Sequence, residues 1–469
     1  MAIWKRSSDR TLNRMPCCQK QTGLILSLLA LFTLSCSESP DWKVGTARIE
    51  ITPESPMWMG GFGARNKRSE GTSMPLYVKA LAIEDSSGSH VVLIVGEMTG
   101  YFEYLASQVA QRVKGEFGLN RDQLLFSATH THSGPFIKRA RPGAWKLDPE
   151  EQKRVDLYAD QLVEYTFEAV KGALRNLAPA QLAFGKTAVG FAANRRVVTD
   201  EGVHLGVTPE GTVDHSVPIL KVTNPDGGLV AVVFGYACHN TTLGSENYLF
   251  HGDFAGVAHS WLETKHPGAL AFFVTGCGAD INPNPKRGMD TVQRHGEDLA
   301  VAVDRALEAG LNRVEGPLSY RLVRFPLQLA PPPTREDLLD RLESQSIYVR
   351  NHATEMLKIL DCEGHLMTEY PYTLQVFQFG EDFTLVAMAG EVVVDYSLRL
   401  ANELGANLWV ASHCNDVFAY IPSRRILVEG GYEADSSMMF YGFPGRWDSS
   451  IEETIIAKVH EVVGELRVQ

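Results

Sequence analysis

The chain has 469 residues, of which 44% are hydrophobic and 21% charged, a composition typical of a globular protein with a large core. Its formal net charge of −12 at pH 7 argues against nucleic acid or an anionic membrane surface as the main partner.

The first 36 residues have the pattern of a targeting segment and do not enter the fold prediction. A basic start precedes the apolar run 23–34, which is shorter than the roughly 20 residues that a membrane-spanning helix needs. The run ends in Leu34-Ser35-Cys36, which resembles a bacterial lipoprotein signal with Cys36 as the lipidated first residue of the mature chain. We expect export to the bacterial cell envelope and a lipid anchor at Cys36. Secretion after cleavage nearby is the alternative.

Residues 37–469 are expected to form a single catalytic α/β domain, with mixed β-sheets flanked by helices, because strand and helix patterns alternate throughout. Expected strands span residues 42–52, 76–84, 91–96, 124–128, 218–223, 229–237, 372–379 and 384–389. Expected helices span residues 102–116, 149–174, 256–265, 288–309, 335–345, 392–404 and 450–467.

Six apolar, strand-like segments each run directly into an ionisable or metal-ligating side chain. These side chains are Glu97, His130, His239, Asp280, Glu391 and His413. One polar strand end is unremarkable, but six together indicate that the carboxyl ends of the strands carry the chemistry. Two histidines from separate strands plus a carboxylate are a ligand set of hydrolytic zinc.

The stretch 127–135 places His130 and His132 just after the strand 124–128. Successive side chains of a strand point to opposite faces, so the two imidazoles share a face. They can form a metal site or an acid/base pair, and a surface turn with two histidines is the alternative.

Four cysteines follow Cys36, with no Cys-x-x-Cys spacing typical of zinc sites. One or two disulfides are possible after export, although the sequence does not give their pairing. Cys238, Cys277 and Cys414 lie beside the strand ends, where we expect them to pack as small buried side chains.

Several ordered motifs between about residues 42 and 445 resemble the neutral (non-lysosomal) ceramidases, zinc-dependent amidases that cleave N-acylsphingosine. The motifs are residues 44–53, 59–62, 127–135, 194–195, 237–239, 252–253, 389–391, 415–420 and 432–434. The most specific are His-Thr-His-Ser-Gly-Pro at 130–135 and the spacing of twelve positions between Tyr420 and Tyr432.

The resemblance implies one zinc ion per chain, held by His130, His239, Glu391 and Tyr420. Zinc on such ligands lowers the pKa of a bound water towards roughly 7, which makes hydroxide available at neutral pH.

The resemblance also places His132, Arg195 and Tyr432 around the substrate amide. His132 or Tyr432 would donate to the oxyanion, Arg195 would complement negative charge or bind a substrate hydroxyl, and His132 would pass a proton to the leaving amine. The general base stays open among His132, Asp253 and the zinc-bound hydroxide. A surface salt bridge is the alternative role for Arg195, and packing is the alternative for Tyr432.

The chain departs from the family pattern at positions that shape the pocket. Asn282 stands where the family has an active-site serine, which excludes a serine nucleophile there. Residues 136–138 replace glycines, and Gly430 replaces a glutamine. Only one helix is expected after Trp447, so we also expect no C-terminal β-sandwich.

The leading expectation is a zinc-dependent amidohydrolase that cleaves a linear carbon–nitrogen bond, as in the conversion of N-acylsphingosine to sphingosine and fatty acid. One alternative is a zinc hydrolase of another acylated compound, such as an N- or O-acyl sugar. Another is a non-catalytic, ligand-binding lipoprotein, against which the complete set of proposed ligands argues. The pattern does not predict an oligomeric state.

Overall fold

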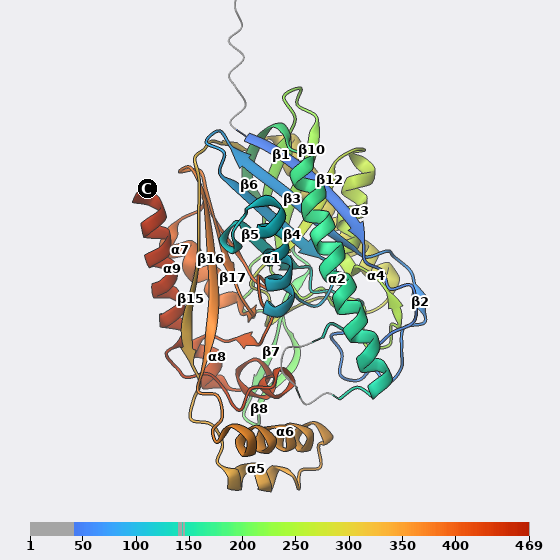
Figure 1. The fold of residues 1–469 in the computed structure, drawn as a ribbon, viewed down its shortest axis with the longest axis vertical. Coiled ribbons are helices and arrows are strands. Elements are labelled where there is room, and N and C mark those ends of the chain that lie inside the picture. Colours follow the sequence, from blue (N-terminus) through green and yellow to red (C-terminus); the bar gives the residue numbers. More distant parts are fainter. Residues whose placement is uncertain (1–41, 139–142, 144–145, 469) are drawn as a thin grey trace, which may run out of the picture. The chain divides into compact units, whose positions relative to one another are not determined.

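The computed structural model describes residues 42–138, 143 and 146–468 (Figure 1). The expected targeting segment and Cys36 lie outside these residues. Within them, no helix combines the length and apolar character needed to cross a membrane.

A nine-stranded mixed sheet forms the first half of the core (Figure 1). The strand order is β12-β10-β9-β6-β1-β3-β4-β5, with β14 paired to β6. Pairs β4–β5 and β10–β12 are parallel, whereas the other pairs are antiparallel. The strands are β1 (Trp42–Glu50), β3 (Tyr77–Asp85), β4 (His90–Gly96), β5 (Leu124–Ala128), β6 (Ala178–Ala188), β9 (Ser216–Thr223), β10 (Leu229–Tyr236), β12 (Leu270–Thr275) and β14 (Asn312–Val314).

A four-stranded sheet packs against one face of the large sheet. Its order is β15 (Leu318–Gln328), β16 (Glu369–Phe379), β17 (Phe383–Met388) and β19 (Leu408–Ala411). The strand period of two sends Leu81 and Ile83 into the core between the sheets, where Phe184 stacks on Phe383 with ring centroids 4.2 Å apart. Burying each such side chain contributes about 1.5–3 kcal/mol, so this apolar interface holds the two sheets together.

Helices cover the outer faces of both sheets. Helices α1 (Glu103–Phe117) and α2 (Pro149–Arg175) pack on Ala80, Ala82 and their neighbours. Helices α3 (Asp253–Lys265) and α4 (Met289–Ala309) cover β9, β10 and β12, while α7 (Val394–Leu404) and α9 (Ile451–Val468) cover the smaller sheet. The described chain thus stacks as helix, sheet, sheet and helix layers.

The remaining elements lie at the edges of these layers. The helices are α5 (Arg335–Arg341), α6 (Ile347–Glu363) and α8 (Arg424–Glu429), with the short helical turns η1 (Arg121–Gln123), η2 (Tyr432–Ser436) and η3 (Met438–Tyr441). Two strand pairs are β2 (Gly71–Thr72) with β11 (Leu249–Phe250) and β18 (Glu391–Val392) with β20 (Tyr420–Ile421). A small sheet has the order β13 (Ile281–Pro283), β7 (Ala192–Thr199) and β8 (Gly202–Thr208).

The expected fold class, α/β with mixed sheets flanked by helices, is confirmed. Most expected elements differ from the observed ones by only a few residues at their ends. The predictions missed β6, β7, β8, β15 and α6. Cys238, Cys277 and Cys414 are buried, and these three and the exposed Cys362 are free thiols.

Candidate metal centre

Strand ends from both sheets converge on one cluster of donor side chains. His130 lies two residues beyond β5, His239 three beyond β10 and His413 two beyond β19, while Glu391 opens β18. Isolated bridges Ser127↔Cys414 and Gly276↔Ala411 tie the sheets together at these ends. The expectation that the site lies at the carboxyl ends of strands is thereby met.

The donor atoms are spaced as the ligands of one metal ion would be. Glu391 Oε2 lies 3.4 Å from His130 Nε2 and 3.2 Å from His239 Nε2, and the Tyr420 hydroxyl lies 3.4 Å from His239 Nε2. Ligands about 2.0–2.1 Å from a tetrahedral zinc ion are about 3.3–3.4 Å apart. The three observed separations match this distance between ligands.

Backbone carbonyls hold the two histidines with Nε2 facing the cluster. His130 Nδ1 lies 2.6 Å from the Thr99 carbonyl oxygen, and His239 Nδ1 lies 2.8 Å from that of Gly278. A carbonyl only accepts, so both Nδ1 atoms carry hydrogen, and a neutral ring held in this way presents a lone pair at Nε2. Burial lowers the pKa of His239 to about 3, so its ring is neutral at pH 7.

Glu391 supplies the charge that a cation would need. Burial would raise its pKa, but positive charge on His130 beside it holds that pKa well below the usual range, and a metal ion at the same place would have the same effect. Its Oε1 accepts a hydrogen bond from Tyr441, whereas its buried Oε2 has no hydrogen-bond partner among the described residues. A buried carboxylate oxygen facing imidazole lone pairs fits a metal ion.

The backbone sets the position of Tyr420 relative to Glu391. The two residues face each other in the parallel register of β18 and β20. Burial and the nearby Glu391 raise the pKa of Tyr420 well above its ordinary value, even with Arg195 beside it, so the phenol stays protonated unless a metal ion binds to it.

His132 lies beside the donor cluster. Its Nε2 is 3.1 Å from His130 Nε2, and its buried Nδ1 has no hydrogen-bond partner within the described chain. Gly61 leaves room for the ring, since a Cβ there would lie 2.3 Å from the ring carbon Cγ. Burial, then the neighbouring His130, lowers the pKa of His132 well below its ordinary value.

Arg195 is a buried part of this site, not a surface ion pair. Its Nε donates to Glu433 over 2.8 Å, and its Nη2 donates to the Tyr420 hydroxyl over 3.2 Å. Tyr432 packs edge-on against Tyr420, with ring centroids 5.3 Å apart. The structure therefore brings Arg195 and Tyr432 together at the cluster.

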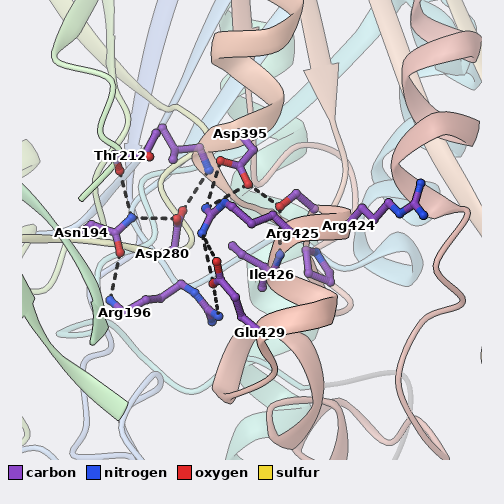
Figure 2. Close-up of polar contacts among 12 residues, drawn as sticks. Asn194, Arg196, Thr212, Asp280, Asp395, Arg424, Arg425, Ile426 and Glu429 are labelled. Atoms are coloured by element: carbon purple, nitrogen blue, oxygen red, sulfur yellow. Dashed lines mark hydrogen bonds and ion pairs between the residues drawn. The ribbon is translucent and has the colours of Figure 1, made fainter. Parts of the chain in front are cut away.

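The residues on either side of Arg195 are fixed by a polar network (Figure 2). Asn194 Nδ2 donates to Asp280 over 3.0 Å, and its Oδ1 accepts from the backbone amide of Arg196 over 2.9 Å. Arg196 donates to Glu429, which also pairs with Arg425. These contacts hold the backbone from which Arg195 projects.

Asp253 and Asn282 lie outside the cluster. The Asp253 carboxylate accepts from the backbone amides of Thr242, Leu243 and Phe254, which fixes the start of α3. Asn282 Oδ1 accepts from the Thr241 hydroxyl over 3.3 Å. Among the described residues, neither Asp253 nor Asn282 forms a hydrogen bond or ion pair with His130, His239, Glu391 or Tyr420. Their catalytic roles stay predictions.

Three side chains that the structure brings into the site have no predicted role. In the sequence, His413 is only a strand end, Glu433 is only part of the motif 432–434, and Tyr441 has no signal. All three reach the site through turns, whose direction a residue pattern does not specify.

The cluster lines a cavity of about 520 Å³. The lining residues include His130, His132, Glu391, Tyr420, Tyr432 and Tyr441, together with apolar Met59, Phe136, Leu147, Val417 and Phe440 and polar Lys138, Lys146, Gln152 and Glu355. Lys138 and Lys146 are exposed, so the cavity is open to solvent. The cavity therefore combines candidate metal ligands with apolar and charged walls.

Residues 42–287 match the family model described as "Neutral/alkaline non-lysosomal ceramidase, N-terminal". The chain belongs to this family. The family relatives include neutral ceramidase from Pseudomonas aeruginosa, which is 24% identical over 275 residues, or 56% of this chain and 40% of the relative. Neutral ceramidase A from Dictyostelium discoideum is 25% identical over 275 residues, covering 54% and 37%. The match therefore spans less than half of each of these family members.

A family member of known structure shares the fold. The crystal structure of neutral ceramidase from Pseudomonas aeruginosa superposes with a TM-score of 0.71 at 17% identity, over 92% of this chain and 75% of that chain. The shared fold therefore continues beyond residue 287, into the part that carries Glu391, His413 and Tyr420.

Proposed function

We propose that this protein is a zinc-dependent amidohydrolase that cleaves a linear amide, with N-acylsphingosine as the first candidate substrate. The observation that carries the proposal is the spacing of the donor atoms: the distances from Glu391 to His130, from Glu391 to His239 and from His239 to Tyr420 are those expected between ligands of one zinc ion.

Zinc bound there would polarise the amide carbonyl and lower the pKa of a water molecule. The side chains around it have separate roles. Arg195 keeps a positive charge in a buried site, because Tyr420 and Glu433 raise its pKa against the effect of burial. Tyr432 can donate a hydrogen bond to the amide oxygen as negative charge develops there. His132 is neutral, so it can take the proton that the attacking water loses and then pass it to the leaving amine.

The cavity supports an acyl substrate. Apolar Met59, Leu147 and Phe440 suit a hydrocarbon chain, and Lys138 and Glu355 suit a polar head group. This mixture favours an acylated amphiphile, and the family relatives make ceramide the first example. Acylated sugars are the second candidate, because the polar wall suits hydroxyl groups. Attachment to the cell envelope through Cys36 is part of the proposal and awaits mass analysis of the mature N-terminus.

Metal content and amidase activity of the purified protein test the proposal together. We expect about one zinc per chain in the wild type and loss of both zinc and hydrolysis in His130→Ala and His239→Ala. His460→Ala, on the exposed surface of α9, is the matched control and should keep both. A wild type that cannot be loaded with metal would overturn the proposal. A loaded protein that cleaves acyl sugars and not N-acylsphingosine would replace the substrate.

A further inference from the structure

His413 is a buried imidazole with an unused nitrogen that faces the donor cluster. Its side chain has no solvent exposure, and its Nε2 has no hydrogen-bond partner among the described residues. That atom lies 3.9 Å from Glu391 Oε2, and the ring centroid lies 4.2 Å from that of His130. A buried polar atom without a partner is rare enough to require an explanation.

The neighbouring Ser412 indicates which nitrogen of His413 carries the hydrogen. Its hydroxyl oxygen accepts from the Val392 backbone amide over 3.1 Å and donates its single hydrogen to the Gly390 carbonyl over 3.2 Å. The 2.9 Å contact between this oxygen and His413 Nδ1 is then donated by Nδ1. Nε2 is left with a lone pair, as in His130 and His239.

The backbone at His413 is held in an unfavourable conformation to achieve this placement. Its φ is +56°, in the left-handed region that residues other than glycine adopt uncommonly. His130 has a φ of +59° at the corresponding distance beyond its own strand. Strain of this kind persists where the surrounding structure fixes a functional side chain.

We propose that His413 is a further ligand of the metal, donating through Nε2, in addition to the four donors already assigned. A lone pair facing a carboxylate oxygen with nothing between them is repulsive, and a shared cation removes the repulsion. The 3.9 Å separation exceeds a tetrahedral edge, but two donors about 2.1 Å from a metal are about 3.6 Å apart at 120° and about 4.2 Å apart at 180°. These wider angles occur in sites with more than four ligands, so His413 would either join the four donors or exchange with one of them, which leaves a position for water. The inference rests on the proposed metal site.

Two substitutions of His413 test whether this residue binds the metal or only donates a hydrogen bond to Glu391. His413→Gln places an amide nitrogen near the position of Nε2 and can still donate to Glu391, whereas His413→Asn is too short and relieves the positive φ. If His413 is a ligand, both variants weaken zinc binding by more than about 100-fold, beyond the 10–100-fold typical of lost outer contacts. Both should also alter the visible absorption of the cobalt-substituted protein.

Ser412→Ala serves as the outer-contact control, and it should weaken binding by only about 10–100-fold while leaving the cobalt spectrum similar to that of the wild type. Denaturant unfolding of the metal-free proteins checks that each variant folds. If His413→Gln keeps wild-type affinity and spectrum, His413 only supports Glu391 and this inference is wrong. A wild type without metal would instead defeat the proposed function, and His130→Ala, which should lose all metal, distinguishes the two failures.

Discussion

At the scale of single residues, the site depends on a buried ion pair next to the metal donors. Arg195 and Arg196 both pair with Glu433, whose side chain is completely buried. Burial would raise the pKa of Glu433, but Arg195 holds it below the ordinary range. Glu433 thus bridges two buried guanidinium groups, one of which also pairs with Glu429, and it orients the one that reaches Tyr420.

Glu433→Gln should therefore destabilise the fold and lower activity while leaving zinc content unchanged. Removing one partner of a buried ion pair costs about 3–5 kcal/mol, because the remaining charge is left uncompensated. Denaturant unfolding and metal analysis of the same samples measure both effects. Glu429→Gln, which affects a half-buried partner of Arg196 and of the exposed Arg425, should cost less. Equal losses in the two variants would contradict this reading of Glu433.

At the scale of elements, the sequence predicted the strands that are buried and apolar, and it missed elements that are largely exposed to solvent. Strands such as β5 and β10 are apolar runs, and the ligands at their ends could be located from the sequence. Strand β15 is largely half-exposed, and α6 buries only His352, Ala353 and Met356, so neither has a strong periodic signal.

The turns that follow the strands also could not be predicted from the sequence. The residues between β19 and β20 include His413 and Asn415, both with positive φ, so neither helix nor strand periodicity applies to them. The family resemblance supplied Tyr420, which no spacing argument would have placed. The role of His413 requires the three-dimensional arrangement.

The loop at Gly61 offers a test at this scale. Gly61 has a φ of +91°, and a Cβ there would lie 2.3 Å from His132 Cγ. Gly61→Ala should displace His132 and reduce the rate of hydrolysis at least about tenfold, since misplacing a group that touches the substrate is costly. Gly88→Ala is the matched control, with a φ of +87° and no atom within 4 Å of the new Cβ. Both variants should lose about 1–2 kcal/mol of stability from the backbone, and only Gly61→Ala should lose activity. Comparable rates in the two variants would remove His132 from the mechanism.

At the scale of the whole molecule, burial of one carboxyl group links stability to pH. Burial raises the pKa of Asp280 from 3.8 to about 6 in the folded chain, although Val394 and Asn194 donate hydrogen bonds to it. The folded chain therefore binds this proton more tightly than the unfolded chain. The stability that protonated Asp280 contributes is complete below about pH 4 and is lost as the pH rises through about 6.

We therefore expect Asp280→Asn to lack this loss. Between pH 4 and pH 7 the wild type should lose about 3 kcal/mol relative to the variant, at 1.36 kcal/mol for each unit of pKa difference. Urea unfolding of both proteins across that range, with chelator present throughout, isolates the difference, because the other titrating groups are common to both. Parallel stability curves would show that Asp280 has an ordinary pKa.

The donor set is divided along the chain in a way that bears on how the protein is made. His130 and His239 lie within the segment that matches the family model, whereas Glu391, His413 and Tyr420 lie beyond its end at residue 287. Glu391 and Tyr420 are brought together only when β18 pairs with β20. A ribosome must therefore complete nearly the whole domain before the full donor set exists. If the proposed site binds a metal ion, we therefore expect the ion to be acquired late in the life of the nascent chain, after both sheets have formed.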